Sequence, residues 1–179
     1  KGGAISVWGA NSTLIVKDAT FTGNHSTGNG GAIWIGGDAK VATTISDNVI
    51  ITGGSSENGG SIHINQPITI SGNVQIKGGH AGTYGGNLYL AAGADTTIKD
   101  NVKITGGICD YNGGNIYMTG GSTQVYLKDN AEVSGGIAAA GGGNVFVNSN
   151  SDFYMVGGTM KDGTSKWATD KVYWGGGNL

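Results

Sequence analysis

The most regular feature of the sequence is a block of six residues. It begins with two glycines and a small or amide residue, and it ends with two apolar residues on either side of a residue that is expected to point outward. In residues 113–118 this block reads Gly-Gly-Asn-Ile-Tyr-Met. It also begins at positions 2, 30, 59, 85 and 142 and starts again at 176, so successive blocks lie 26 to 34 residues apart. A repeat of this length is typical of a solenoid, in which each unit buries its apolar face by stacking on its neighbours.

A second pattern follows each block and predicts two further strands. In residues 97–107 an isoleucine precedes Asp100-Asn101 and a Val-x-Ile step follows, and residues 44–54 have the same arrangement. Alternation with a period of two indicates short strands. Asp-Asn is a natural corner, because these side chains bond to nearby backbone and Asn tolerates a left-handed conformation. Each repeat is therefore expected to hold three strands, and no helical periodicity occurs.

Three short strands per repeat predict an all-β fold, namely a single-stranded parallel β-helix (solenoid) of about six coils of ~28 residues. Right-handed winding is expected from the usual crossover preference. We expect residues 1–179 to form one β-helix segment of a longer chain. In the last coil, residues 159–175 are expected to be an atypical insertion, in which Trp167, Tyr173 and Trp174 either cover the end or form a protruding loop.

Stacked repeats place equivalent residues above one another and so predict continuous columns. One interior aliphatic column follows the paired glycines and consists of Ile5, Ile33, Ile62, Leu88, Ile116 and Val145. Another follows the acidic corner and consists of Val49, Val74, Val102 and Ala131. Asn87, Asn115 and Asn144, with Asn178, predict an amide ladder that satisfies backbone groups at a corner.

Composition narrows the functional classes. The chain has 37 glycines, one proline and a net charge of −2, and its ten basic residues are all lysines. A nucleic-acid-binding surface normally shows an arginine-rich basic stripe, so nucleic acid is not an expected partner. No apolar run reaches the length of a membrane span, so we expect no membrane insertion by this segment. The lone Cys109 has no internal partner for a disulfide and is expected to be a small buried residue.

Two short motifs carry a family resemblance. Gly2-Gly3-Ala4-Ile5 and residues 30–33, with Phe21-Thr22-Gly23-Asn24 between them, resemble the GGAI and FxxN repeats of polymorphic outer-membrane proteins, which are autotransporter-type surface adhesins of bacteria. The later Gly-Gly-Asn copies resemble the glycine-rich β-helix repeats of large bacterial surface proteins. The resemblance implies an exported cell-surface or extracellular stalk, often adhesive, without catalytic residues.

The outward position of the glycine-led block is the sharpest candidate site. Alternation places these side chains on the face opposite the core, and five of the six are rings: Trp34, His63, Tyr89, Tyr117 and Phe146. Exposed rings are suited to stacking on sugars or docking a protein surface. Alternatively, the column stabilises adjacent strands or lies buried under another domain or a second copy.

Other polar residues suggest less chemistry. The acidic corners Asp18, Asp47, Asp100 and Asp129 have oxygen ligands of the kind calcium prefers. Gly72 interrupts that column and lysines adjoin three of the acids, so we expect solvated corners and no metal. His25, His63 and His80 fall at different repeat positions. Hydrolysis of a polysaccharide requires a pair of carboxylates held across a cleft. The sequence leaves open whether the fold brings Asp110 close to Asp129 or Asp152 to form such a pair. We expect neither an enzyme nor a cofactor.

The sequence thus predicts a structural and adhesive β-helix segment of a bacterial cell-surface or extracellular protein. Its expected partners are further copies, stacked end to end into fibres, or a host or cell-surface glycan or protein. A carbohydrate-binding or polysaccharide-degrading β-helix module is the alternative.

Overall fold

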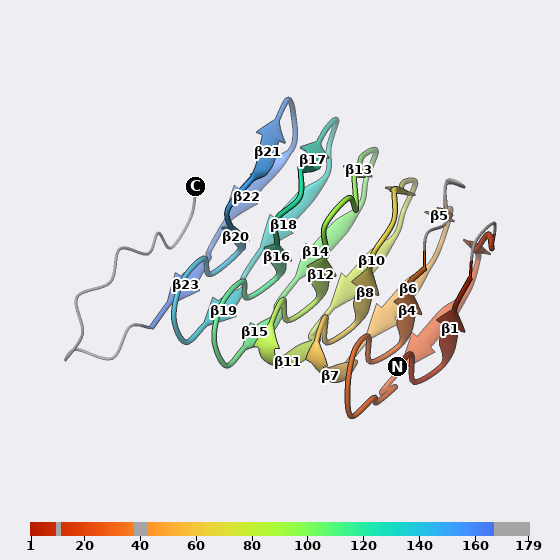
Figure 1. Ribbon diagram of the computed structural model, residues 1–179. Coiled ribbons are helices and arrows are strands. Elements are labelled where there is room, and N and C mark those ends of the chain that lie inside the picture. The colour runs from red at the N-terminus through yellow and green to blue at the C-terminus, as the bar shows by residue number, and fades with distance from the viewer. Residues whose placement is uncertain (10–11, 38–42, 167–179) are drawn as a thin grey trace.

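The computed structural model describes residues 1–9, 12–37 and 43–166, which form a parallel β-solenoid of about six coils (Figure 1). These residues contain short strands and no helix. Equivalent strands of successive coils lie side by side along the rod and pair only in parallel register. The predicted fold class is confirmed.

Four sheets run along the rod. We call them sheets A, B, C and D, in the order in which the chain visits them in each coil. Sheet A holds the glycine-led blocks: β1 (Ile5–Val7), β4 (Ile33–Ile35), β8 (Ile62–Ile64), β12 (Leu88–Leu90), β16 (Ile116–Met118) and β20 (Val145–Val147). Sheet B precedes the acidic corner: β2 (Ile15–Lys17), β5 (Thr43–Ser46), β9 (Ile68–Ile70), β13 (Thr96–Ile98), β17 (Thr123–Leu127) and β21 (Ser151–Met155).

Sheet C follows that corner: β3 (Thr20–Thr22), β6 (Ile50–Thr52), β10 (Gln75–Lys77), β14 (Lys103–Thr105), β18 (Glu132–Ser134) and β22 (Thr159–Lys161). Sheet D closes the coil: β7 (Ser55–Asn58), β11 (His80–Tyr84), β15 (Ile108–Cys109), β19 (Ile137–Ala138) and β23 (Thr164–Ser165). The expectation of three strands per coil is therefore incomplete, because a fourth forms where the sequence suggests a corner. Its strands are as short as two residues and turn small side chains such as Ala81 and Ala138 inward, so they carry little periodic signal.

The expectation that residues 159–175 form an insertion is wrong for residues 159–166, the part that the structure describes. Thr159–Lys161 and Thr164–Ser165 are β22 and β23, which pair in register with β18 and β19 and continue the regular coil. Trp167, Tyr173, Trp174 and Asn178 lie outside the described residues.

The core is a set of continuous aliphatic columns. In sheet A, Ile5, Ile33, Ile62, Leu88, Ile116 and Val145 are register partners from coil to coil, as predicted. Val49, Val74, Val102 and Ala131 are fully buried at the start of sheet C, which agrees with the second predicted column. Ile51 points into the core while its neighbour Ile50 is half-buried on the outside.

The corners depend on two backbone devices. Between sheets B and C the left-handed residue is the aspartate, with a φ of 62° at Asp100, rather than the asparagine that the sequence suggests. Between sheets D and A the two glycines have different roles. Gly113 has a φ of 74°, and Gly114 packs so closely on the next coil that a Cβ there would clash with the carbonyl oxygen of Gly143.

The packing predicts very different effects for two neighbouring substitutions in β6. Ile51→Asp buries a charge without a partner, so we expect it to lower the free energy of unfolding by more than about 4 kcal/mol. Ile50→Asp places the same charge on the outer face, and we expect a loss of about 1 kcal/mol. Urea unfolding followed by circular dichroism measures both, and similar losses would contradict the inward assignment of Ile51.

Candidate functional site

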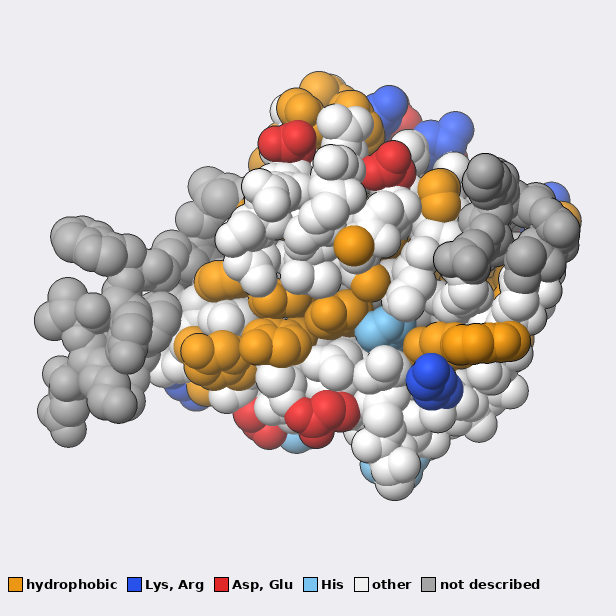
Figure 2. Space-filling model, in the orientation of Figure 1, with side chains coloured by type: hydrophobic (Ala, Val, Ile, Leu, Met, Phe, Trp, Pro, Cys, Tyr) orange, Lys and Arg blue, Asp and Glu red, His pale blue; other side chains and the backbone are white. Residues whose placement is uncertain are grey.

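The outer face of sheet A carries a column of stacked rings. Trp34, His63, Tyr89, Tyr117 and Phe146 are register partners on successive strands, so parallel pairing places each above the next. The ring centroids of His63 and Tyr89 are 4.4 Å apart, those of Tyr89 and Tyr117 5.4 Å, and those of Tyr117 and Phe146 5.5 Å. Figure 2 shows hydrophobic side chains in a band along the rod, with a histidine within it.

These rings are less exposed than the sequence suggests. Trp34, His63 and Tyr117 expose only 3, 5 and 4% of their surface, and Tyr89 and Phe146 are half-buried. The expectation of an exposed ladder is therefore wrong for three of the five. From His63 to Phe146 the interplanar angles of 6° to 16° mean that the rings cover one another's faces and leave mainly their edges accessible. Such pairs contribute about 0.5–1.5 kcal/mol each, which makes stabilisation a direct role of the column.

Residues outside the column extend one of its ends and cover its flank. Trp8 stacks on Trp34 at 5.4 Å and is itself 69% exposed, and the Lys1 ammonium lies 4.4 Å from the Trp34 ring centroid. Tyr84 of sheet D stacks on Tyr117 at 4.3 Å. Tyr111, which is 49% exposed, meets Tyr84 edge-on at 5.8 Å. Sequence reasoning missed Tyr84 and Tyr111, whose one available signal is that each shortly precedes a glycine pair.

Burial changes the acid–base behaviour of the column. Desolvation lowers the pKa of His63 from 6.5 to about 4; the Asn65 side chain partly offsets this, and the charge of Lys1 adds to it. His63 is therefore neutral at pH 7. Burial also raises the pKa of the phenols of Tyr89 and Tyr117. The rings thus form an uncharged surface at neutral pH.

Inside the corner between sheets D and A, the asparagines form a continuous amide ladder. Asn87 Nδ2 donates to Asn115 Oδ1 at 2.8 Å, and Asn115 Nδ2 donates to Asn144 Oδ1 at 2.9 Å. Asn115 Oδ1 also accepts the N–H of Gly107, and its Nδ2 donates to the carbonyl of Ser134. The other two make equivalent backbone bonds, and all three are fully buried. The ladder therefore ties neighbouring coils and neighbouring sheets together.

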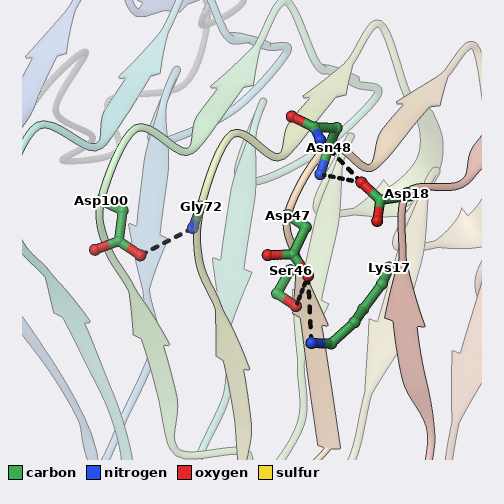
Figure 3. Close-up of polar contacts among 7 residues, drawn as sticks. All are labelled: Lys17, Asp18, Ser46, Asp47, Asn48, Gly72 and Asp100. Carbon is green, nitrogen blue, oxygen red and sulfur yellow. Dashed lines mark hydrogen bonds and ion pairs between the residues drawn. The ribbon is translucent and has the colours of Figure 1, made fainter.

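The acidic corners between sheets B and C form bonds from coil to coil (Figure 3). Asp100 Oδ2 accepts the N–H of Gly72 at 2.9 Å, and Asn48 Nδ2 donates to Asp18 Oδ1 at 2.8 Å. The Lys17 Nζ atom lies 3.3 Å from Asp47 Oδ2 and forms an ion pair with it. These contacts give the carboxylates structural partners, and the described residues hold no cluster of three or more histidine, cysteine or acidic side chains placed to bind a metal.

A second amide ladder, which sequence reasoning missed, follows these acids. Asn73 donates to Asn48 and Asn101 donates to Asn73, each at 3.2 Å, and Asn130 donates to Asn101 at 3.4 Å. These side chains are exposed, in contrast to the buried ladder of Asn87, Asn115 and Asn144.

The histidines and the cysteine have different environments. His25 and His80 lie in one outward column of sheet D, with Ser55 between them, so the view that the three histidines occupy unrelated positions is wrong for this pair. His25 Nδ1 lies 2.9 Å from Ser55 Oγ, and His80 Nε2 lies 3.0 Å from Asp110. Cys109 is buried, and desolvation raises the pKa of its thiol to about 11, so it is a thiol at neutral pH.

The carboxylates considered for catalysis occupy different parts of the coil. Asp110 follows β15 in sheet D, Asp129 lies at the corner between sheets B and C, and Asp152 lies on β21 in sheet B. The structure therefore does not bring Asp110 together with either of the others along one sheet.

Among the residues that the structure describes, no helix has the length and apolar character needed to cross a membrane.

Comparisons of the chain with protein-family models, with curated proteins and with solved structures gave no significant match.

The buried amide ladder predicts a position-specific loss of stability. Asn115→Ala removes the hydrogen bonds that Asn115 makes with Gly107, Ser134, Asn87 and Asn144 inside the corner, so we expect the free energy of unfolding to fall by about 2–4 kcal/mol. Asn130→Ala in the exposed ladder is the matched control, with an expected loss below about 1 kcal/mol. Chemical denaturation measures the free energy of unfolding of both variants. Equal losses of this free energy would show that the buried ladder has no special role.

The buried His63 predicts a loss of stability in acid. Its pKa in the fold lies below the unfolded value of 6.5, so the unfolded chain takes up the proton more readily. The contribution of neutral His63 to the free energy of unfolding is therefore fully present above pH 6.5. It falls by about 3 kcal/mol as the pH drops from 6.5 to 4. His63→Phe keeps a ring in the column and removes the titration. Denaturation midpoints across this pH range should fall more steeply for the parent; parallel curves would contradict a neutral, buried His63.

Proposed function

We propose that this chain is a structural segment of an adhesive bacterial protein, located at the cell surface or outside the cell, and that its role is to hold binding surfaces on a stiff rod. The observation that carries the proposal is the unbroken bonding from coil to coil along the axis. The buried asparagine ladder runs through the corner, and parallel sheets surround the core.

Three further features support a mechanical role. The ring column on sheet A and the exposed asparagine ladder each join successive coils. The aspartates at the corners bond to the backbone or amide of a neighbouring coil. Because each coil is joined to the next at its core, its corners and its outer face, bending or stretching the rod has to break many contacts together.

The adhesive role is supported by the resemblance of the repeats to those of bacterial surface adhesins and by the exposed rings at the borders of the sheet A column. Trp8 and Tyr111 expose 69 and 49% of their surface. Aromatic side chains are enriched at binding interfaces, where they add large apolar contacts to a polar handle. The partner in this proposal is a glycan or protein of a host or cell surface, and end-to-end association of copies into fibres is a further part of it.

Attachment under flow tests the proposal. Microspheres coated with the chain are expected to adhere to epithelial cell layers more strongly than microspheres coated with albumin. The double variant Trp8→Ser and Tyr111→Ser removes exposed rings outside the buried column, so we expect weaker attachment by a chain that still folds. Loss of the Trp8–Trp34 and Tyr84–Tyr111 ring contacts should lower the melting temperature by only a few degrees.

The matched control is Asn130→Ala, an exposed change away from these rings that should leave attachment unaltered. Attachment equal to that of the albumin-coated microspheres would identify a passive spacer. Attachment of the double variant equal to that of the parent would contradict the binding role of Trp8 and Tyr111. Electron micrographs of the same preparation separate isolated rods from fibres and so test end-to-end association.

A further inference from the structure

The outer face of sheet B changes from threonine to tyrosine along one column. Thr44, Thr69, Thr97, Tyr126 and Tyr154 are successive register partners. Tyr126 and Tyr154 stack with their centroids 4.8 Å apart and an interplanar angle of 14°. On its other side in the column Tyr126 is followed by Thr97, which has no ring. The aromatic stack therefore stops at Tyr126.

A hollow lies where the next ring of this column would be. Its volume is about 250 Å³, and its outer lining comes from Pro67, Thr69, Asp95, Thr97, Gln124 and Tyr126. Pockets for drug-sized ligands are about 300–1,000 Å³, so this hollow suits a single small ring. It therefore combines one aromatic wall, a threonine floor and a polar edge.

The polar edge is held in place by hydrogen bonds within the protein. Asp95 Oδ1 accepts the backbone N–H of Gln124 at 2.9 Å, and the hydroxyl of Tyr126 donates to Gln124 Oε1 at 3.2 Å. A carboxylate has about four acceptor positions and a glutamine amide has two donor hydrogens, so both side chains retain capacity for a ligand. Asp95 and Gln124 come from different coils, and their bond fixes the edge beside the tyrosine.

We propose that this hollow binds one neutral pyranose ring of a β-linked glycan, which takes the place of the missing aromatic ring beside Tyr126. A pyranose with equatorial hydroxyls has a flat C–H face, which packs on an aromatic ring, and a rim of hydroxyls, which requires donors and acceptors of the kind that Asp95, Gln124 and the threonines supply. The site lies on sheet B and does not rest on the proposed function, whose exposed rings border sheet A.

The charges around the hollow favour a neutral sugar. Asp95 is the one charged residue in its lining, and it would repel a carboxylate or sulfate group. The Lys128 ammonium lies 5.0 Å from the centroid of the Tyr126 ring but does not line the hollow. Its cation–π contact supports the orientation of the ring, while hydroxyl recognition is left to Asp95 and Gln124.

An NMR titration of the whole chain with β-1,4-linked gluco-oligosaccharides tests the proposal. We expect saturable shifts of the Thr69 and Thr97 methyl groups and of the Gln124 backbone amide. Sorbitol, an acyclic polyol with similar hydroxyl groups and no ring, should cause no saturable shift. Absence of the oligosaccharide shifts, or equal shifts with sorbitol, would overturn the assignment.

Two variants test the residues with little risk to the fold. Tyr126→Thr introduces the residue that three preceding coils carry at this register, and we expect it to weaken binding about tenfold. Asp95→Asn keeps an oxygen for the Gln124 N–H and should weaken binding about threefold. Ile108→Thr, a change at an exposed apolar residue of sheet D that does not line the hollow, is the matched control and should bind as the parent does. Undiminished binding by a folded Tyr126→Thr variant would overturn the proposal.

Discussion

The structure depends on close contact between the backbones of successive coils at the corner between sheets D and A. At the second glycine of the pairs from Gly3 to Gly114, a backbone carbonyl group of the next coil occupies the space that a side chain would need. The same contact recurs at Gly31, Gly60 and Gly86, each with the second glycine of the following coil. This contact fixes the register of each coil on its neighbour, and the glycine pair is therefore the unit on which the repeat is built.

Register then determines the other axial interactions. Because equivalent residues lie directly above one another, a single asparagine per coil becomes a continuous buried ladder, and a single ring per coil becomes a stack. The same rule leaves the hollow beside Tyr126, where a column changes from a ring to a threonine. Regular columns stabilise the rod, whereas a break in a column leaves a space in which a ligand can bind.

Much of this arrangement could be predicted from the sequence. Alternation with a period of two shows which side chains lie on the same face of a strand. It located the aliphatic columns and the asparagine ladder by residue. It missed sheet D, whose strands, such as Ile108–Cys109, are too short to show a period. Without sheet D, the shared column of His25 and His80 was not apparent. The burial of Tyr117 was missed for the same reason, since Tyr84 comes from sheet D and packs against it.

Two glycine-to-alanine substitutions test the role of the close backbone contact at Gly114 most directly. Gly78 has a φ of 65° and open space where a Cβ would be, so Gly78→Ala adds only backbone strain of about 1–2 kcal/mol. Gly114→Ala instead forces apart the backbones of two coils. Measured by urea unfolding, Gly114→Ala should lower the free energy of unfolding at least about twice as much, because a clash inside a packed fold is among the most destabilising changes. An equal or smaller loss at Gly114 would show that close contact between the coil backbones is not what the fold depends on.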